Sequence, residues 1–130
     1  MYKALNERRK ERAKAIRVGS EYANKLKEEI GPLTAILYGS FARGNFNLGS
    51  DIDVLIISNN LPLNPLKRME LLYRCISGGI EPKGYTQAEF ISMLKLQNPI
   101  ALNTLQNGVI LLDNSFWERL THQKSTHSND

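Results

Sequence analysis

The amino-acid sequence predicts an α/β (α+β) domain in which a small mixed β-sheet packs against helices. Short apolar stretches of strand length alternate with longer stretches whose apolar residues recur every three or four positions. The predicted order is α-β-β-α-β-α-α-β-α, and the first two strands are joined by only eleven residues, part of which we expect to be helical. With 130 residues, 42% of them hydrophobic, the chain has the length and composition of one globular domain.

The N-terminal part is predicted to hold one long helix and two strands. Residues 3–30 keep a helical apolar stripe and end at a Gly-Pro pair. The first turns lack large apolar side chains, so we expect residues 1–20 to form a basic helical extension. Apolar strands are predicted at residues 33–39 and 51–58.

A helix and a third strand are predicted next. Asn64 caps a helix that has Pro65 at its first position and ends at a Gly-Gly pair. Its predicted apolar face consists of Leu66, Met69, Leu72, Tyr73 and Ile76. Residues 79–86 form a weaker strand, because Pro82 and Gly84 disfavour a central position in a sheet.

The C-terminal part is predicted to hold three helices and one more strand. Thr86 and Glu89 form a capping box for a helix that extends to about residue 96. Asn98 and Pro99 begin another helix, and a short strand follows at residues 109–113. Ser115 is the predicted cap of a last helix, and residues 122–130 are expected to form a polar tail.

Charge and composition exclude several classes of protein. Residues 1–17 carry seven Lys and Arg against two Glu, a local charge of +5, whereas the whole chain has a net charge of +4. Because the basicity is local, a nucleic-acid partner is not favoured. Cys75 is the only cysteine, so an internal disulfide and a cysteine metal cluster are excluded. No apolar run approaches the ~20 residues of a membrane helix, and the N-terminus has no signal core. We therefore expect a cytoplasmic protein without a membrane partner.

The second strand carries two aspartates, Asp51 and Asp53, on one face. Their Cα atoms are expected to lie roughly 6.6 Å apart on the face opposite the apolar side chains. Two carboxylates this close repel one another, and a hard cation such as Mg²⁺ relieves that repulsion. Pairs of metal ions about 3.5–4 Å apart are the common device for phosphoryl transfer. The spacing therefore predicts a metal site at the start of this strand.

A phosphate-binding turn is predicted just before the aspartates. Gly39 lets a ligand approach the backbone closely, Ser40 offers a hydroxyl, and Arg43 offers a guanidinium group that suits phosphate. An antiparallel return of the second strand would bring this turn to Asp51 and Asp53.

The stretch GSFARGNFNLGSDIDVLII, residues 39–57, resembles the G-S-x10-D-x-D signature of the DNA polymerase β-like nucleotidyltransferase superfamily. The length of the chain and its Arg43-Gly44 pair resemble the minimal nucleotidyltransferases (MNT) of that superfamily. The resemblance covers roughly residues 20–120 and implies a nucleotidyltransferase palm-like fold, with residues 20–121 as the catalytic domain. It also implies transfer of a nucleoside monophosphate from ATP or another nucleoside triphosphate, with two Mg²⁺ ions for which Mn²⁺ could substitute.

The same resemblance implies a role for each site residue. Gly39 and Ser40 would bind the triphosphate, and Asp51 and Asp53 would hold both metals. The family usually places a third carboxylate on the next core strand, where it binds metal and accepts a proton. Glu81 is the matching residue in this sequence. Glu81 is one methylene longer than the usual Asp and precedes Pro82, which lacks a ladder donor. A surface carboxylate is the alternative interpretation of Glu81.

The expected function is that of a Mg²⁺-dependent nucleotidyltransferase that releases pyrophosphate. The resemblance implies two kinds of acceptor: a helical HEPN-type toxin, which an MNT antitoxin inactivates by adenylylation, or a small molecule such as an aminoglycoside. The chain has little beyond the core, which favours a partner protein that supplies the acceptor group. The alternative function is a non-catalytic module that binds a nucleotide or a partner through the same fold.

Overall fold

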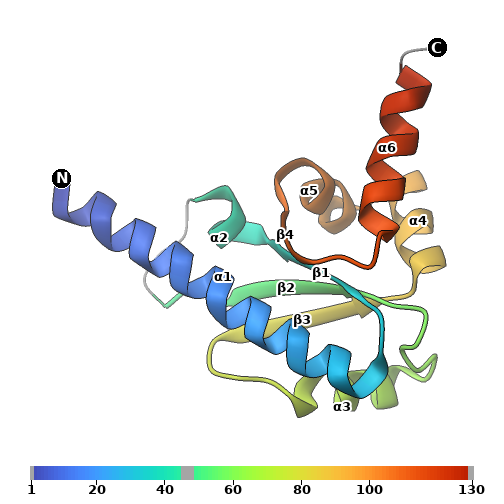
Figure 1. The fold of residues 1–130 in the computed structure, drawn as a ribbon, viewed down its shortest axis with the longest axis horizontal. Helices are drawn as coiled ribbons and strands as arrows, with labels where there is room; N and C mark the ends of the chain where they lie inside the picture. The colour runs from blue at the N-terminus through green and yellow to red at the C-terminus, as the bar shows by residue number, and fades with distance from the viewer. Residues whose placement is uncertain (1, 45–48, 129–130) are drawn as a thin grey trace.

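A mixed four-stranded sheet lies at the centre of the molecule (Figure 1). The structure is a computed structural model that describes residues 2–44 and 49–128. Strand β1 (Thr34–Tyr38) pairs antiparallel with β2 (Ile52–Ile57) and with β4 (Val109–Leu112). Strand β3 (Ile80–Tyr85) pairs parallel with β2, which gives the order β3-β2-β1-β4. The predicted fold class is confirmed, and Pro82 and Gly84 lie in an edge strand as their chemistry requires.

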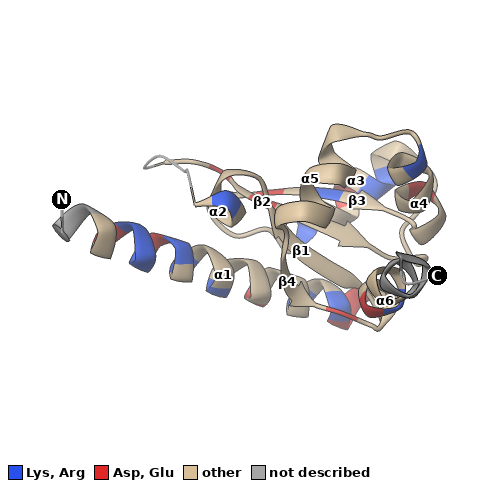
Figure 2. Cartoon of the chain, turned by 90° about the horizontal axis from the view of Figure 1, so that it is seen from above, with Lys and Arg blue, Asp and Glu red and all other residues tan. Residues whose placement is uncertain are grey.

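Helices cover both faces of this sheet. In the described residues they are α1 (Tyr2–Ile30), α2 (Gly39–Arg43), α3 (Pro65–Arg74), α4 (Gln87–Lys95), α5 (Pro99–Asn107) and α6 (Phe116–Ser128). Helices α1 and α3 pack on one face, and α4, α5 and α6 pack on the other (Figure 1). The N-terminal turns of α1 extend past the sheet and are rich in Lys and Arg (Figure 2). None of the described helices has the length and apolar character needed to span a bilayer.

Strand β2 contributes to two separate apolar cores. Ile52, Val54 and Ile56 point into the core beneath α1 and α3, while Leu55 and Ile57 point into the core beneath α4, α5 and α6. The sequence analysis assigned an apolar core only to the first of these faces. Asp53 points to the same face as Leu55 and Ile57, so it lies at one end of the second core.

The structure corrects the prediction for the apolar face of α3. Of the five residues predicted to form its apolar face, only Leu72 is buried. The others are exposed, at 66% for Leu66, 57% for Met69, 43% for Tyr73 and 37% for Ile76. Helix α3 lies beside the edge strand β3, so only the flank that carries Leu71 and Leu72 meets the sheet. The remaining apolar stripe therefore faces solvent.

The caps of the helices follow the sequence with one exception. Asn64 and Asn98 cap α3 and α5, and the predicted capping box begins α4. At α6 the predicted cap Ser115 is wrong, because the Asp113 carboxylate accepts hydrogen bonds from the backbone N–H groups of the helix, at 3.1 and 3.2 Å. Helix α6 continues through Ser128, so most of the predicted polar tail is helical. Residues 129–130 of that tail and residues 45–48 of the predicted connection lie outside the described residues.

Candidate active site

Gly39 and Asp53 lie against each other where β1 ends. The antiparallel register pairs Tyr38 with Asp53, so the turn that follows β1 meets the start of β2, as predicted. Gly39 has a φ of 74°, a conformation that favours glycine. A Cβ atom on Gly39 would overlap the Asp53 carboxylate. Any larger residue would therefore displace that carboxylate or the turn.

Two contacts that the sequence analysis missed hold helix α2, which contains Gly39, Ser40 and Arg43. The Gly39 N–H donates to Asn103 Oδ1 of α5 at 3.3 Å. Arg12 Nε of α1 donates to the Phe41 carbonyl at 3.2 Å, and its Nη2 to the next carbonyl at 3.5 Å. Arg12 thus packs against the body of the protein, although it lies within the predicted basic extension. Both contacts join residues far apart in the chain, so no local pattern could have revealed them.

Glu81 stands directly beside Asp53 in the sheet. The parallel register pairs these two residues, and neighbouring strands are about 4.8 Å apart. The register continues without a shift from Ile80 to Tyr85, so Pro82 leaves β3 regular. Glu81, Lys83 and Tyr85 therefore share the face of Asp53, as expected for a regular strand.

The electrostatics of this site centre on Asp53. Burial raises the pKa of Asp53, and the nearby carboxylates of Glu81 and Asp51 raise it further. Lys83 and Arg43 act in the opposite direction on the same pKa. Asp51 lies just before β2 and is exposed, whereas Asp53 is half-buried. The structure therefore brings the three predicted carboxylates close enough to repel one another.

The donor set fits a divalent cation, because carboxylate oxygens are the ligands that Mg²⁺ prefers. The raised pKa of Asp53 shows that its charged form lacks sufficient compensation from the protein alone. Across the described residues, no three His, Cys, Asp or Glu side chains are already gathered as a metal site. A bound cation would thus have to draw the carboxylates together.

Tyr38 is a further polar residue at this site. It is only 6% exposed, and its buried hydroxyl has no hydrogen-bond partner. Burial raises the pKa of Tyr38, and the charge of Asp53 raises it further. The sequence analysis treated Tyr38 simply as part of an apolar strand.

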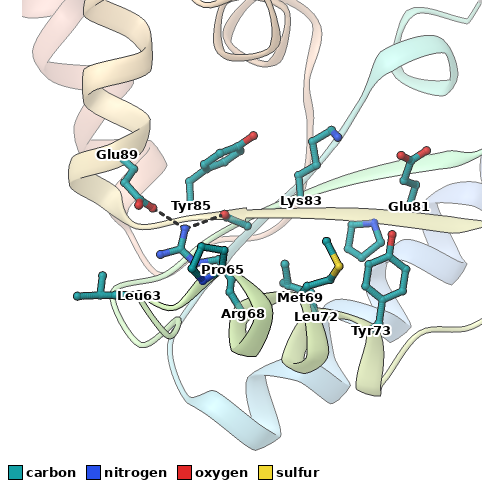
Figure 3. A pocket seen from close by; sticks show the side chains of 12 residues that line it. Leu63, Pro65, Arg68, Met69, Leu72, Tyr73, Glu81, Lys83, Tyr85 and Glu89 are labelled. Atoms are coloured by element: carbon teal, nitrogen blue, oxygen red, sulfur yellow. Dashed lines mark hydrogen bonds and ion pairs between the residues drawn. The ribbon is translucent and has the colours of Figure 1, made fainter.

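A groove adjoins the acidic residues along the open edge of β3. Its cavity has a volume of about 430 Å³ and lies between β3, α3 and the loop before α3. Glu81, Lys83 and Tyr85 project on one side of β3, whereas Met69 and Tyr73 approach from α3 on the other (Figure 3). The groove therefore has an apolar wall and a polar rim, and it includes Glu81.

Comparisons with known proteins identify the family of the chain. Residues 19–101 match the family described as "Nucleotidyltransferase domain". The "Putative protein adenylyltransferase MJ1305" of Methanocaldococcus jannaschii is 30% identical over 106 residues, which cover 75% of this chain and 72% of that protein.

Two solved structures share the fold. A putative nucleotidyltransferase from Sulfolobus solfataricus has a TM-score of 0.65 at 18% identity, over 84% of this chain and 89% of that one. A chain from a toxin-antitoxin structure with AMP-PNP has a TM-score of 0.50 at 17% identity, over 85% of this chain and 96% of that one. At these identities the two structures support the fold alone.

Proposed function

The chain belongs to the nucleotidyltransferase domain family and is a nucleotidyltransferase, and we propose that it transfers AMP from ATP to a protein acceptor. Its similarity to a protein named as a protein adenylyltransferase supports both the nucleotide and the class of acceptor. A chain of a toxin-antitoxin structure with AMP-PNP shares the fold, and on that analogy we propose a partner protein as the acceptor. A helical HEPN-type toxin is the acceptor that we favour.

The observation that carries this proposal is the position of Asp53. Its carboxylate is half-buried between Gly39 of the turn after β1 and Glu81 of β3. Burial and the two neighbouring carboxylates disfavour the charged form of Asp53. A bound cation would offset both effects. The missing side chain of Gly39 leaves the space that the Asp53 carboxylate occupies, so this carboxylate lies against the turn that we propose binds the triphosphate.

Each predicted site residue has a role in the proposed reaction. Gly39, Ser40 and Arg43 would bind the triphosphate, and Asp51, Asp53 and Glu81 would hold Mg²⁺ or Mn²⁺. Two such ions, when bound, would neutralise the charge that develops on the transferred and leaving phosphates.

The remaining chemistry concerns one proton and two bonds. The acceptor oxygen attacks the α-phosphorus, and its proton passes to the Glu81 carboxylate. A bond forms between that oxygen and phosphorus, while the bond from the α-phosphorus to the β-phosphate oxygen breaks. Pyrophosphate leaves with the electron pair of the broken bond.

The test uses the full chain, Mg²⁺ and a host cell lysate as the source of acceptor. Radiolabel at the α-phosphate of ATP should appear on a protein, whereas label at the γ-phosphate should appear in pyrophosphate. Glu81→Gln should keep ATP affinity within a few-fold, yet lower transfer by about 10²-fold or more, as expected for loss of a general base.

Glu21→Gln, at an exposed position of α1, is the matched control and should change neither property. Transfer of γ-label to the protein beyond the amount seen in lysate without this chain would contradict the proposed reaction. Full transfer by Glu81→Gln would exclude its role as the base.

A further inference from the structure

Helix α3 carries a solvent-facing apolar stripe. Leu66, Met69 and Tyr73 recur at helical spacing on α3, Ile76 follows just after the helix, and each of the four is more than a third exposed. Burial against the sheet is already provided by Leu71 and Leu72. Met and Tyr are among the residues enriched in protein interfaces. The stripe is therefore not needed to hold α3 in place and has the composition of a contact surface.

Two residues of this stripe, Met69 and Tyr73, line one wall of the α3–β3 groove, the cavity of about 430 Å³ beside β3. Ligand sites in proteins have volumes of about 300–1,000 Å³, with apolar walls and a few polar groups. Arg68 and Glu89 close one end of the groove through an ion pair of 2.7 Å (Figure 3). Glu81 lies at the other end, beside the proposed reaction centre.

The open edge of β3 is poorly suited to pair with an added strand. The Gly79 and Tyr85 carbonyls accept hydrogen bonds from the β2 side, so the backbone groups of Pro82 and Gly84 face outward. Pro82 has no N–H to donate, and the Gly84 carbonyl already accepts from Arg68 Nη1 at 3.2 Å. A ligand in the groove must therefore bind through side-chain contacts rather than by extending the sheet.

The order of the strands places the groove on the acceptor side of the reaction. The triphosphate turn follows β1, Asp53 lies on β2, and Glu81 lies on β3. In phosphoryl transfer the attacking and leaving oxygens are roughly in line across the phosphorus. If pyrophosphate leaves on the β1 side, the acceptor must enter from the β3 side, where the groove ends.

We propose that the α3–β3 groove binds the protein acceptor through apolar side chains that pack on Met69 and Tyr73, and that it thereby presents the acceptor hydroxyl to Glu81. This inference rests on the proposed function and adds the place of docking. An aminoglycoside is a polar polycation and does not match the apolar side chains of Met69 and Tyr73. The charged side chains that line the groove balance one another, Lys83 and Arg68 against Glu81 and Glu89, so the groove offers a polycation no excess negative charge. A polypeptide supplies both the apolar contacts and the hydroxyl.

The test compares Met69→Glu with Leu96→Glu. Leu96 is 80% exposed just after α4, and its substitution is the matched control for adding a charge at an exposed apolar position. Transfer of α-label from ATP to a lysate protein should fall about tenfold or more in Met69→Glu, the loss expected at an interface hot spot. Affinity for ATP with Mg²⁺, measured by calorimetry, should be unchanged in both variants, and Leu96→Glu should transfer normally.

The other outcomes overturn the inference in distinguishable ways. If the wild-type chain neither binds ATP nor transfers label, the proposed function has failed and the inference falls with it. Equal transfer by wild type and Met69→Glu, or label on a small molecule alone, overturns only the docking site. Weaker ATP binding in Met69→Glu would place the nucleotide in the groove. Dimers that sediment as such in the wild type but not in Met69→Glu would assign the stripe to a second copy.

Discussion

The two faces of the β-sheet have the same backbone but different tasks. On the face beneath α1 and α3, Ala35, Leu37, Val54 and Ile56 are completely buried. The opposite face is apolar beneath α4, α5 and α6, but at its open end it carries Asp53 with charged neighbours. Because successive side chains of a strand alternate, β2 supplies both faces from one short sequence. Substitutions at adjacent positions of β2 should therefore affect the stability of the fold at one position and AMP transfer at the next.

Two buried tyrosines show the same difference at the level of one atom. The Tyr22 hydroxyl, on the side of α1, donates to the Leu72 carbonyl at 2.6 Å. The Tyr38 hydroxyl, on the opposite face, has no partner. One face is thus satisfied internally, whereas the other keeps polar groups that the protein alone does not satisfy.

The largest expected contrast is between Ile56→Ala and Asp53→Asn. Ile56→Ala should lower the free energy of unfolding by about 2–5 kcal/mol because it leaves a cavity in the core, while the folded protein transfers AMP normally. Asp53→Asn should lower transfer by about 10²-fold or more, since removing several kcal/mol of charge stabilisation has that effect. Urea unfolding and single-turnover transfer measure the two effects. Loss of both stability and transfer in either variant would contradict the division of tasks between the two faces.

The difference in stability between Asp53→Asn and the wild type should also depend on pH. The folded-state pKa of Asp53 is raised above its ordinary value of 3.8, so its protonated form favours folding. That contribution is present below the ordinary value and is lost as pH rises through the folded-state pKa. Without metal, Asp53→Asn should therefore be more stable than wild type at neutral pH, and the difference should vanish in acid. Added Mg²⁺ should stabilise the wild type alone.

A smaller effect is expected from alanine at Gly39 and Gly44. Both glycines have positive φ, at 74° and 83°, so each substitution should cost about 1–2 kcal/mol in backbone strain. Only the Gly39 substitution adds an overlap with Asp53, because none of the described residues places an atom within 4 Å of a Cβ at Gly44. Gly39→Ala should therefore destabilise more, and the excess should disappear in an Asp53→Ala background. Equal urea midpoints for the two single variants would argue against the close packing of Gly39 on Asp53.

The smallest expected effects are of opposite sign. Tyr22→Phe should lower the free energy of unfolding by about 1 kcal/mol, because it removes a buried hydrogen bond. Tyr38→Phe should leave stability equal or slightly higher, because its hydroxyl is buried without a partner. Thermal unfolding of both variants without metal tests the difference. A clear loss of stability in Tyr38→Phe would mean that its hydroxyl is satisfied in solution.

Local patterns predicted the strands and most of the caps. Each of these depends on residues that are close in sequence or on a simple alternation. The α3 stripe was assigned wrongly because the helix has two adjacent apolar flanks, and periodicity does not say which flank meets the sheet. The cap of α6 was ambiguous in a similar way, since Asp113 and Ser115 are both good caps.

Tertiary contacts of the site could not be predicted. Asn103 reaches Gly39, and Arg12 reaches Phe41, across long stretches of chain with no motif to mark them. The unsatisfied hydroxyl of Tyr38 depends on the packing of several elements around it. Whether Asp51, Asp53 and Glu81 hold metal stays a prediction, although their common location was anticipated from the sequence.

The pairing of β4 with β1 has a consequence for aggregation. The family match covers residues 19–101, but β4 (Val109–Leu112) follows it and covers one edge of β1. A fragment cut at the family limits would expose the fully buried strand β1 as a free edge, which favours pairing between chains. It would also lose Arg12 and the aromatic side chains of α6 that shield the second core. The unit that resists aggregation should thus be longer than the unit that aligns with the family.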